Sequence, residues 1–124
     1  MLLVISMLVI QWALWFEARG VALSAAQAGA RIAREQQPGW PAQSVSEAVS
    51  FYNKVGTSLL NGVNASVNPA SGNPNQVYVT VGGKIPTLIP LIPPLTVTET
   101  AGGPVECFRP GQAGGGTNCG QAGP

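Results

Sequence analysis

The side chains that could carry chemistry in this sequence are five glutamates and two cysteines. The glutamates share no regular spacing; they are Glu17, Glu35, Glu47, Glu99 and Glu106. Histidine and aspartate are absent, which removes the Ser-His-Asp triad, imidazole–carboxylate metal sites and the commonest general base. Two glutamates can cleave a glycosidic bond, but no spacing here singles out such a pair. We therefore expect no enzyme, with no catalytic, cofactor-binding or metal-binding residues and no small-molecule substrate.

The two cysteines, Cys107 and Cys119, are spaced too widely for a C-x-x-C redox or zinc element. We expect a disulfide that closes the Gly-rich loop 108–118, which a link of this size stabilises by roughly 3 kcal/mol. A disulfide implies an oxidising, exported location. The alternative is a pair of unpaired thiols in an irregular tail.

Charge is scarce along the whole chain. Charged residues make up 9% of the 124 residues and the formal net charge is +1, so the electrostatic footprint of a nucleic-acid-binding protein is missing. Many of the 16 glycines and 11 prolines fall in the last third. Loops are expected to dominate there.

The first sixteen residues form an apolar run, MLLVISMLVIQWALWF. As a helix the run covers about 24 Å of a hydrocarbon layer that is roughly 30 Å thick. Ala26-Gln27-Ala28 has the small residues of a signal-peptidase site, but Glu17 and Arg19 separate it from the apolar run. We therefore favour a retained membrane anchor. The alternative is a secreted or membrane-tethered small binding module whose N-terminal signal is cleaved.

The apolar run continues without a strong helix breaker until Pro38-Gly39, which predicts one helix over about residues 2–36. On a helical wheel five small residues fall in one narrow stripe: Ala18, Ala22, Ala25, Gly29 and Ala33. Such a stripe allows another helix to approach closely, which would serve assembly. It serves equally well to seat the helix against this chain's own sheet, and the sequence does not separate the two interpretations.

A second, amphipathic helix is expected from Ser44 to Asn61. Ser44 and Glu47 match the S-x-x-E capping box, and Asn61-Gly62 supplies a helix stop. The apolar side chains recur at helical spacing on one face: Val45, Ala48, Val49, Tyr52, Val55 and Leu59.

Three segments with period-two alternation predict an antiparallel sheet with one buried face. Their inward positions are Val63, Ala65 and Val67; Val77, Val79 and Val81; and Leu95 and Val97. Turn residues over 68–74 should reverse the chain between the first two strands. The stretch 84–94, KIPTLIPLIPP, is too rich in proline for a helix or a central strand. We expect it to cover the sheet edge; if exposed, it would be an interaction surface.

The orientation of the chain in a membrane receives two opposed signals. Arg19, Arg31 and Arg34 follow the apolar run and favour a cytoplasmic C-terminal side. The cysteines favour the extracytoplasmic side, because disulfides form in oxidising compartments. We give the cysteines more weight.

Three segments of the chain point together to a known family: QWALWFEAR at 11–19, AAQAGAR at 25–31 and AGGPVECF at 101–108. They resemble the TadE-like family of tight-adherence pilus assembly proteins, and the resemblance covers residues 1–108. In the family Arg31 belongs to the recurring G-A-R segment, and the resemblance implies that it and Gly29 matter for packing. Two features depart from the family: Cys107 stands where arginine is commoner, and no prepilin cleavage site precedes the apolar run.

The resemblance implies an α+β, pilin-like fold and a structural role as a minor pilin or pseudopilin. We expect a membrane-anchor helix continuing into the small-residue helix (1–37), a second helix packed on a three-stranded antiparallel sheet in an exported domain (38–106), and a Gly-rich tail (107–124). The expected partners are membrane lipid and other pilin or pilus-assembly subunits, bound through the N-terminal helix, and not nucleic acid. The expected location is the cell membrane, single-pass, with the C-terminal domain extracytoplasmic.

Overall fold

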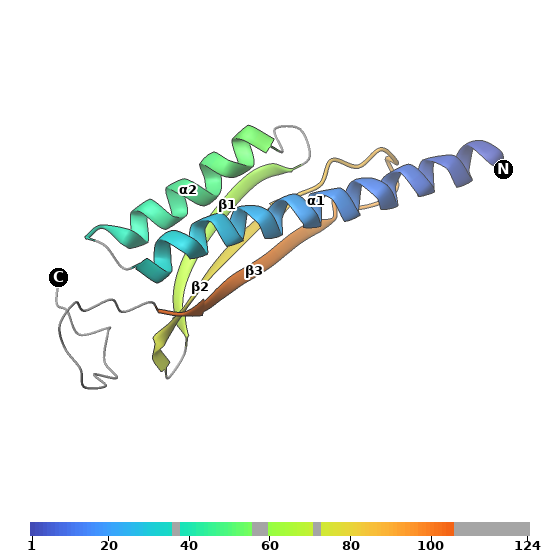
Figure 1. The fold of residues 1–124 in the computed structure, drawn as a ribbon. Coiled ribbons are helices and arrows are strands. Elements are labelled where there is room, and N and C mark those ends of the chain that lie inside the picture. Colours follow the sequence, from blue (N-terminus) through green and yellow to red (C-terminus); the bar gives the residue numbers. More distant parts are fainter. Residues whose placement is uncertain (36–37, 56–59, 71–72, 106–124) are drawn as a thin grey trace, which may run out of the picture.

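The computed structural model describes residues 1–35, 38–55, 60–70 and 73–105, and the fold is α+β (Figure 1). Two helices, α1 (Leu2–Glu35) and α2 (Trp40–Val55), precede three strands, β1 (Asn61–Ala70), β2 (Asn73–Lys84) and β3 (Thr96–Pro104). The strands form one antiparallel sheet in the order β1-β2-β3. The predicted long helix, second helix and three-stranded antiparallel sheet are confirmed.

Helix α1 matches its predicted span to within one residue at its C-terminal end. Its residues are mostly apolar or small, and Arg34 lies in the last turn, where a cation interacts favourably with the helix dipole. The N-terminal third of the helix projects beyond the sheet, whereas the remainder lies across it (Figure 1).

Helix α2 begins four residues earlier than predicted, at Trp40 instead of Ser44. Gly39 turns the chain with a φ of 80°, a conformation that favours glycine, and Pro41 lies in the first turn, where its missing N–H leaves no bond unmade. Ser44 is fully buried inside the helix and its hydroxyl donates to the carbonyl oxygen of Pro41 at 2.9 Å. The predicted capping box is therefore wrong.

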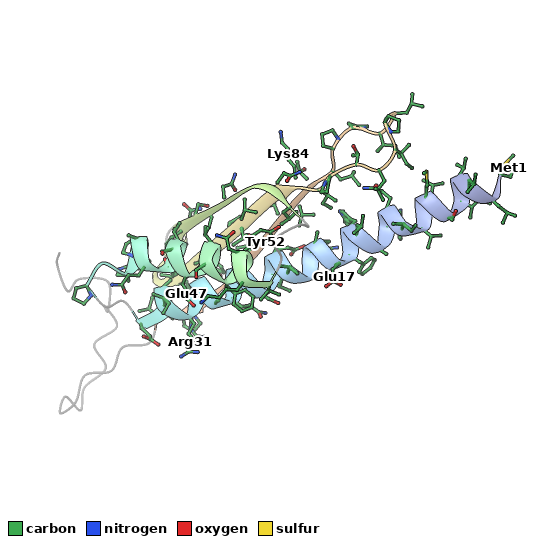
Figure 2. All side chains as sticks on the ribbon, turned by 90° about the horizontal axis from the view of Figure 1, so that it is seen from above. Met1, Glu17, Arg31, Glu47, Tyr52 and Lys84 are labelled. Carbon is green, nitrogen blue, oxygen red and sulfur yellow. The ribbon has the colours of Figure 1, made fainter. Side chains whose placement is uncertain are left out.

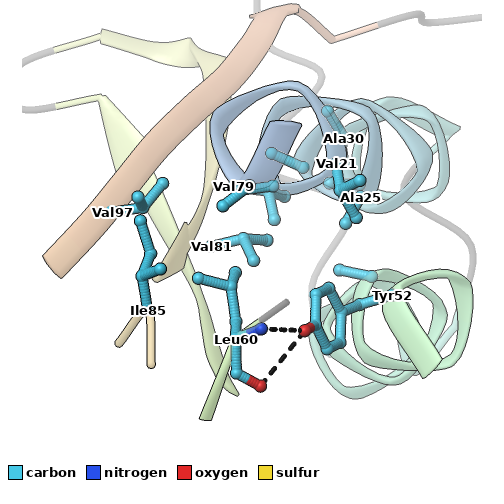
Figure 3. Close-up of a cluster of buried hydrophobic side chains, with 14 of the residues drawn as sticks. Val21, Ala25, Ala30, Tyr52, Leu60, Val79, Val81, Ile85 and Val97 are labelled. Atoms are coloured by element: carbon cyan, nitrogen blue, oxygen red, sulfur yellow. Dashed lines mark hydrogen bonds between the residues drawn. The ribbon is translucent and has the colours of Figure 1, made fainter. Parts of the chain in front are cut away.

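The predicted helix stop at Asn61-Gly62 is also wrong, because both residues belong to β1. The structure describes α2 to Val55, and Leu59 lies outside the described residues. Tyr52 holds the end of α2 close to the start of β1. Its buried hydroxyl accepts the N–H of Leu60 at 2.6 Å and donates to the Leu60 carbonyl at 3.1 Å (Figure 3).

Strand β3 is longer than its apolar residues predict. It runs from Thr96 to Pro104 and stays in register with β2, with Gly102 opposite Tyr78 and Gly103 opposite Val77. The glycines add no side chain to the alternating pattern, which is why this part of the strand carried no signal. A Cβ on Gly102 would lie 2.6 Å from the ring of Tyr78. Because glycine has no side chain, the Tyr78 ring packs directly on the backbone of Gly102.

Both helices cover one face of the sheet, and the core lies between these two layers (Figures 1 and 3). The central strand contributes Val77, Val79 and Val81, all at most 1% exposed. The outer face is polar; there the hydroxyls of Thr80 and Thr100 lie 3.0 Å apart on neighbouring strands. The predicted sheet with one buried face is confirmed, but the predicted inward position of Leu95 is wrong: Leu95 lies outside β3 and is 36% exposed.

The proline-rich chain between β2 and β3 leaves the sheet at its end and lies beside α1 (Figure 1). Ile85 is 1% exposed and closes the core, and its N–H donates to the Leu95 carbonyl at 2.8 Å. Leu88 and Leu91 are exposed. Only the base of this segment therefore covers the core, and its tip extends along α1 instead of over an edge strand.

Candidate functional site

Residues 1–10, at the N-terminal end of α1, present large apolar side chains to solvent. Exposure runs from 101% at Met1 to 45% at Leu8, with Leu3 at 80% and Met7 at 49%. Within the described chain, α1 is the one helix long and apolar enough to cross a membrane. Only 11% of its apolar 18-residue stretch is buried. A helix in the core of a soluble protein would be mostly buried. The exposed segment thus has the surface of a helix that faces lipid or another protein.

Aromatic side chains mark the end of this segment. Trp12 is 69% and Phe16 62% exposed, and the half-buried Trp15 lies between them with ring centroids 6.4 and 5.6 Å away. Glu17, the first charged residue, follows directly and is exposed (Figure 2). Tryptophans next to the first charge are typical of a membrane–water interface, where the ring is partly apolar and partly wet.

Arg19 joins α1 to β3 just beyond the aromatic cluster. Its Nε lies 2.6 Å from Oε1 of Glu99, and its guanidinium lies 4.9 Å from the centre of the Trp15 ring. The two side chains are 46% and 18% exposed, and pairs at the surface contribute about 0–1 kcal/mol. The contact gives Glu99 a structural role, which its isolated position in the sequence did not suggest.

The five small residues of the stripe are all buried inside this chain. Ala18, Ala22, Ala25 and Ala33 are 0% exposed. A Cβ on Gly29 would lie 2.7 Å from the carbonyl oxygen of Ser44 and 3.0 Å from the Cβ of Ala48 on α2. The stripe therefore seats α1 against α2 and the sheet, and in this structure it is not accessible to a neighbouring helix. Of the two sequence interpretations, the structure shows the intramolecular one.

Arg31 lies away from the stripe, on the exposed side of α1 (Figure 2). It lines a shallow surface groove between α1 and β3 together with Gln27, Tyr78 and Thr100. Nearby, Arg34 donates from Nε to the Pro104 carbonyl at 3.0 Å. This contact brings the end of α1 to the Gly103-Pro104 end of β3.

The remaining sequence candidates do not form a chemical site in the described part of the chain. Cys107, Cys119 and Glu106 lie outside the described residues, so the disulfide stays a prediction. Over residues 1–35, 38–55, 60–70 and 73–105, no three His, Cys, Asp or Glu side chains are placed to hold a metal ion. What the described chain offers is a surface for binding: the exposed N-terminal third of α1 and the aromatic residues Trp12 and Phe16 that follow it.

Sequence reasoning missed one polar contact in this region. Gln11 is only 3% exposed, and its Oε1 accepts the N–H of Leu88 at 3.1 Å. A lone glutamine in an apolar run was a visible signal. Its partner lies 77 residues away, which no local pattern connects.

The stripe generates a test of helix packing. Replacing Gly29 with alanine should destabilise the fold by about 1–3 kcal/mol, because the new methyl group meets the Ser44 backbone and α1 must move away from α2. The measurement is urea unfolding in detergent micelles.

The matched control is Gly20→Ala, on the same helix. A Cβ there has no atom within 4 Å, so the substitution should stabilise by roughly 0.5–1 kcal/mol through helix propensity. Equal midpoints for the two variants would show that α1 and α2 are not held in this close contact.

Comparison with known proteins adds no assignment. A scan against protein-family models, a search of characterised proteins and a search of solved structures return no match. The resemblance to TadE-like proteins therefore rests on the three segments quoted above, and function is inferred from the surfaces of the chain.

Proposed function

We propose that this protein is a membrane-anchored, pilin-like structural subunit of a tight-adherence pilus system, and that it acts by assembly and not by catalysis. The observation that carries the proposal is the division of α1: nine exposed apolar residues within Met1–Ile10 precede the part that is built into a small α+β domain. A retained helix that is both anchor and domain core is the architecture a pilin-like subunit requires.

The burial of α1 supports retention of the helix over cleavage. The candidate cleavage sequence Ala26-Gln27-Ala28 lies in the middle of the part of α1 that packs on the domain, where Ala25 and Ala26 are 0% exposed. Cleavage after Ala28 would remove Ala18, Ala22 and Ala25, three of the five buried residues of the stripe. The rival proposal, a secreted binding module, would lose part of its own core.

The accessible part of α1 is the proposed assembly surface. Because the stripe of Ala18, Ala22, Ala25, Gly29 and Ala33 is occupied within the chain, subunits would meet through the exposed apolar segment Met1–Ile10. That segment would lie in lipid before assembly and against helices of other pilin-like subunits afterwards. The C-terminal domain would be extracytoplasmic, an orientation that rests on the predicted Cys107–Cys119 disulfide.

Anchoring is tested by placing charge on the exposed face of α1. The double substitution Met7→Arg and Ile10→Arg should move the protein out of the carbonate-resistant membrane fraction, because each arginine costs about 2.5–3.5 kcal/mol near the centre of a spanning helix. Leu23→Arg is the matched control: Leu23 is 37% exposed on the same helix but follows the first charged residues.

The control should stay in the membrane, and a periplasm-active reporter fused after Pro124 should be active in both the control and the native sequence. Full membrane retention of the double variant would contradict an α1 anchor. If a cytoplasm-active reporter fused at the same position is active and the periplasm-active one is not, the proposed orientation is wrong.

Assembly is tested with a photo-crosslinking amino acid at Val9, which is 63% exposed. In cells that express the pilus system, illumination should give adducts whose second component, identified by mass spectrometry, is another pilin-like subunit. The same probe at Thr98, on the exposed outer face of the sheet, is the comparison. Adducts from Val9 with lipid alone would contradict subunit contact through this segment.

A further inference from the structure

The loop 85–95 between β2 and β3 carries apolar side chains that the fold does not use. Its sequence, IPTLIPLIPPL, has no charged residue. Ile85 is buried in the core, but Leu88 is 49% and Leu91 92% exposed. A loop that only connected two strands would have no need of these exposed leucines, since connecting loops normally present polar side chains to water.

The position of the loop along α1 is fixed by the contact with Gln11. The Leu88 N–H donates to Oε1 of Gln11 at 3.1 Å, and the glutamine side chain is 3% exposed. The loop thus extends from the end of the sheet along α1 toward its N-terminus (Figure 1). A buried polar group that makes such a bond holds its partner in one place, because breaking the bond leaves an unpaired N–H.

This position determines the depth of the loop relative to the first charge on α1. Gln11 precedes Glu17 by six residues, or about 9 Å along a helix. Trp12 and Phe16, the exposed aromatic residues, lie between them. Any arrangement that places the helix in lipid up to its aromatic residues therefore brings Leu88 to the same level or deeper.

The backbone of the loop is suited to a weakly hydrated environment. Pro86, Pro90, Pro93 and Pro94 have no N–H and so leave no donor to be satisfied. Among the other residues of the loop, the N–H groups of Ile85 and Ile92 donate to the carbonyls of Leu95 at 2.8 Å and Ile89 at 3.1 Å, and that of Leu88 donates to Gln11. Each proline and each of these bonds removes one free N–H, which lowers the cost of bringing irregular backbone close to lipid.

Charged and polar groups return at the base of the loop. Lys84 ends β2, opposite Thr96 in β3, and is exposed beside the loop (Figure 2). A lysine at this level can reach lipid phosphates while its alkyl chain stays on the apolar side. The pattern of apolar tip, proline-rich backbone and basic base is that of an element lying at the boundary between acyl chains and headgroups.

We propose that the loop 85–95 is a second membrane-contacting element, which inserts Leu88 and Leu91 into the lipid leaflet from which the domain emerges. The proposal rests on the membrane anchoring of α1 proposed above. With two points of contact, the domain is held at a fixed tilt and height against the bilayer and cannot swing freely about α1. Extraction of the subunit into a filament then requires the loop to leave the lipid together with the helix.

The test uses the full native chain in phosphatidylcholine nanodiscs that contain a lipid with a nitroxide near the headgroup end of its acyl chain. Amide NMR signals of Leu88 and Leu91 should lose most of their intensity, together with those of Trp12 in α1. The signals of Thr98 and Thr100, on the outer face of the sheet, should keep theirs. Broadening of Trp12 with sharp Leu88 and Leu91 signals would overturn the insertion while leaving the anchor intact.

If the signals from Leu3 to Trp12 are also unaffected, the membrane anchoring itself fails, and the insertion fails with it. The variant Leu91→Glu separates insertion from mere proximity. It should restore the intensity of the amide signal at position 91 with no change at Trp12, and the matched variant Thr98→Glu should restore nothing. Unchanged broadening at position 91 in Leu91→Glu would overturn the proposal, because proximity to α1 alone would then account for the signal loss.

Discussion

The close contact of α1 with α2 and the sheet is the constraint on which the rest of this structure depends. At Gly29 the two helices approach until a single methyl group would meet the Ser44 backbone, and the alanines of the stripe are fully buried. Small residues allow this approach because they remove side-chain volume between backbones. With α1 in this position, the side chains of Val77, Val79 and Val81 in the central strand are buried, and one small core forms between the helices and the sheet. The same packing makes the C-terminal half of α1 part of the domain.

This constraint divides the functions of α1 along its length. The C-terminal half is committed to the domain, so the segment Met1–Ile10 is left to meet lipid and partner subunits. Arg19, held between Trp15 and Glu99, and the aromatic residues mark the change between the two halves. The loop with Leu88 and Leu91 lies at this same change, fixed by Gln11. A helix that is anchor at one end and core at the other transmits the orientation of the membrane segment directly to the domain.

The sequence predicted the elements whose periodicity reflects burial, and it failed where contacts are long-range. The span of α1 and the alternating valines were readable because apolar spacing records which face is covered. The start of α2 was misplaced because Ser44 and Glu47 imitate a cap, whereas Gly39 and Pro41 make the turn. The final residues of β3 were missed because glycines carry no alternation. The stripe was recognised, but wheel geometry does not reveal whether its partner belongs to the same chain, and the contact of Gln11 with Leu88 depends on the whole fold.

The claim that α1 is retained as both anchor and core is tested most directly by mass spectrometry of the protein purified from native membranes. After digestion with trypsin, we expect the membrane fraction to yield the apolar peptide 1–19, and the intact mass to show that the same molecules contain β3. We expect no chain whose first residue is Gly29, since cleavage after Ala28 would remove Ala18, Ala22 and Ala25, which are buried in the core. A mature species that begins at Gly29 and is recovered in the soluble fraction would show that α1 is cleaved and does not serve as both anchor and core.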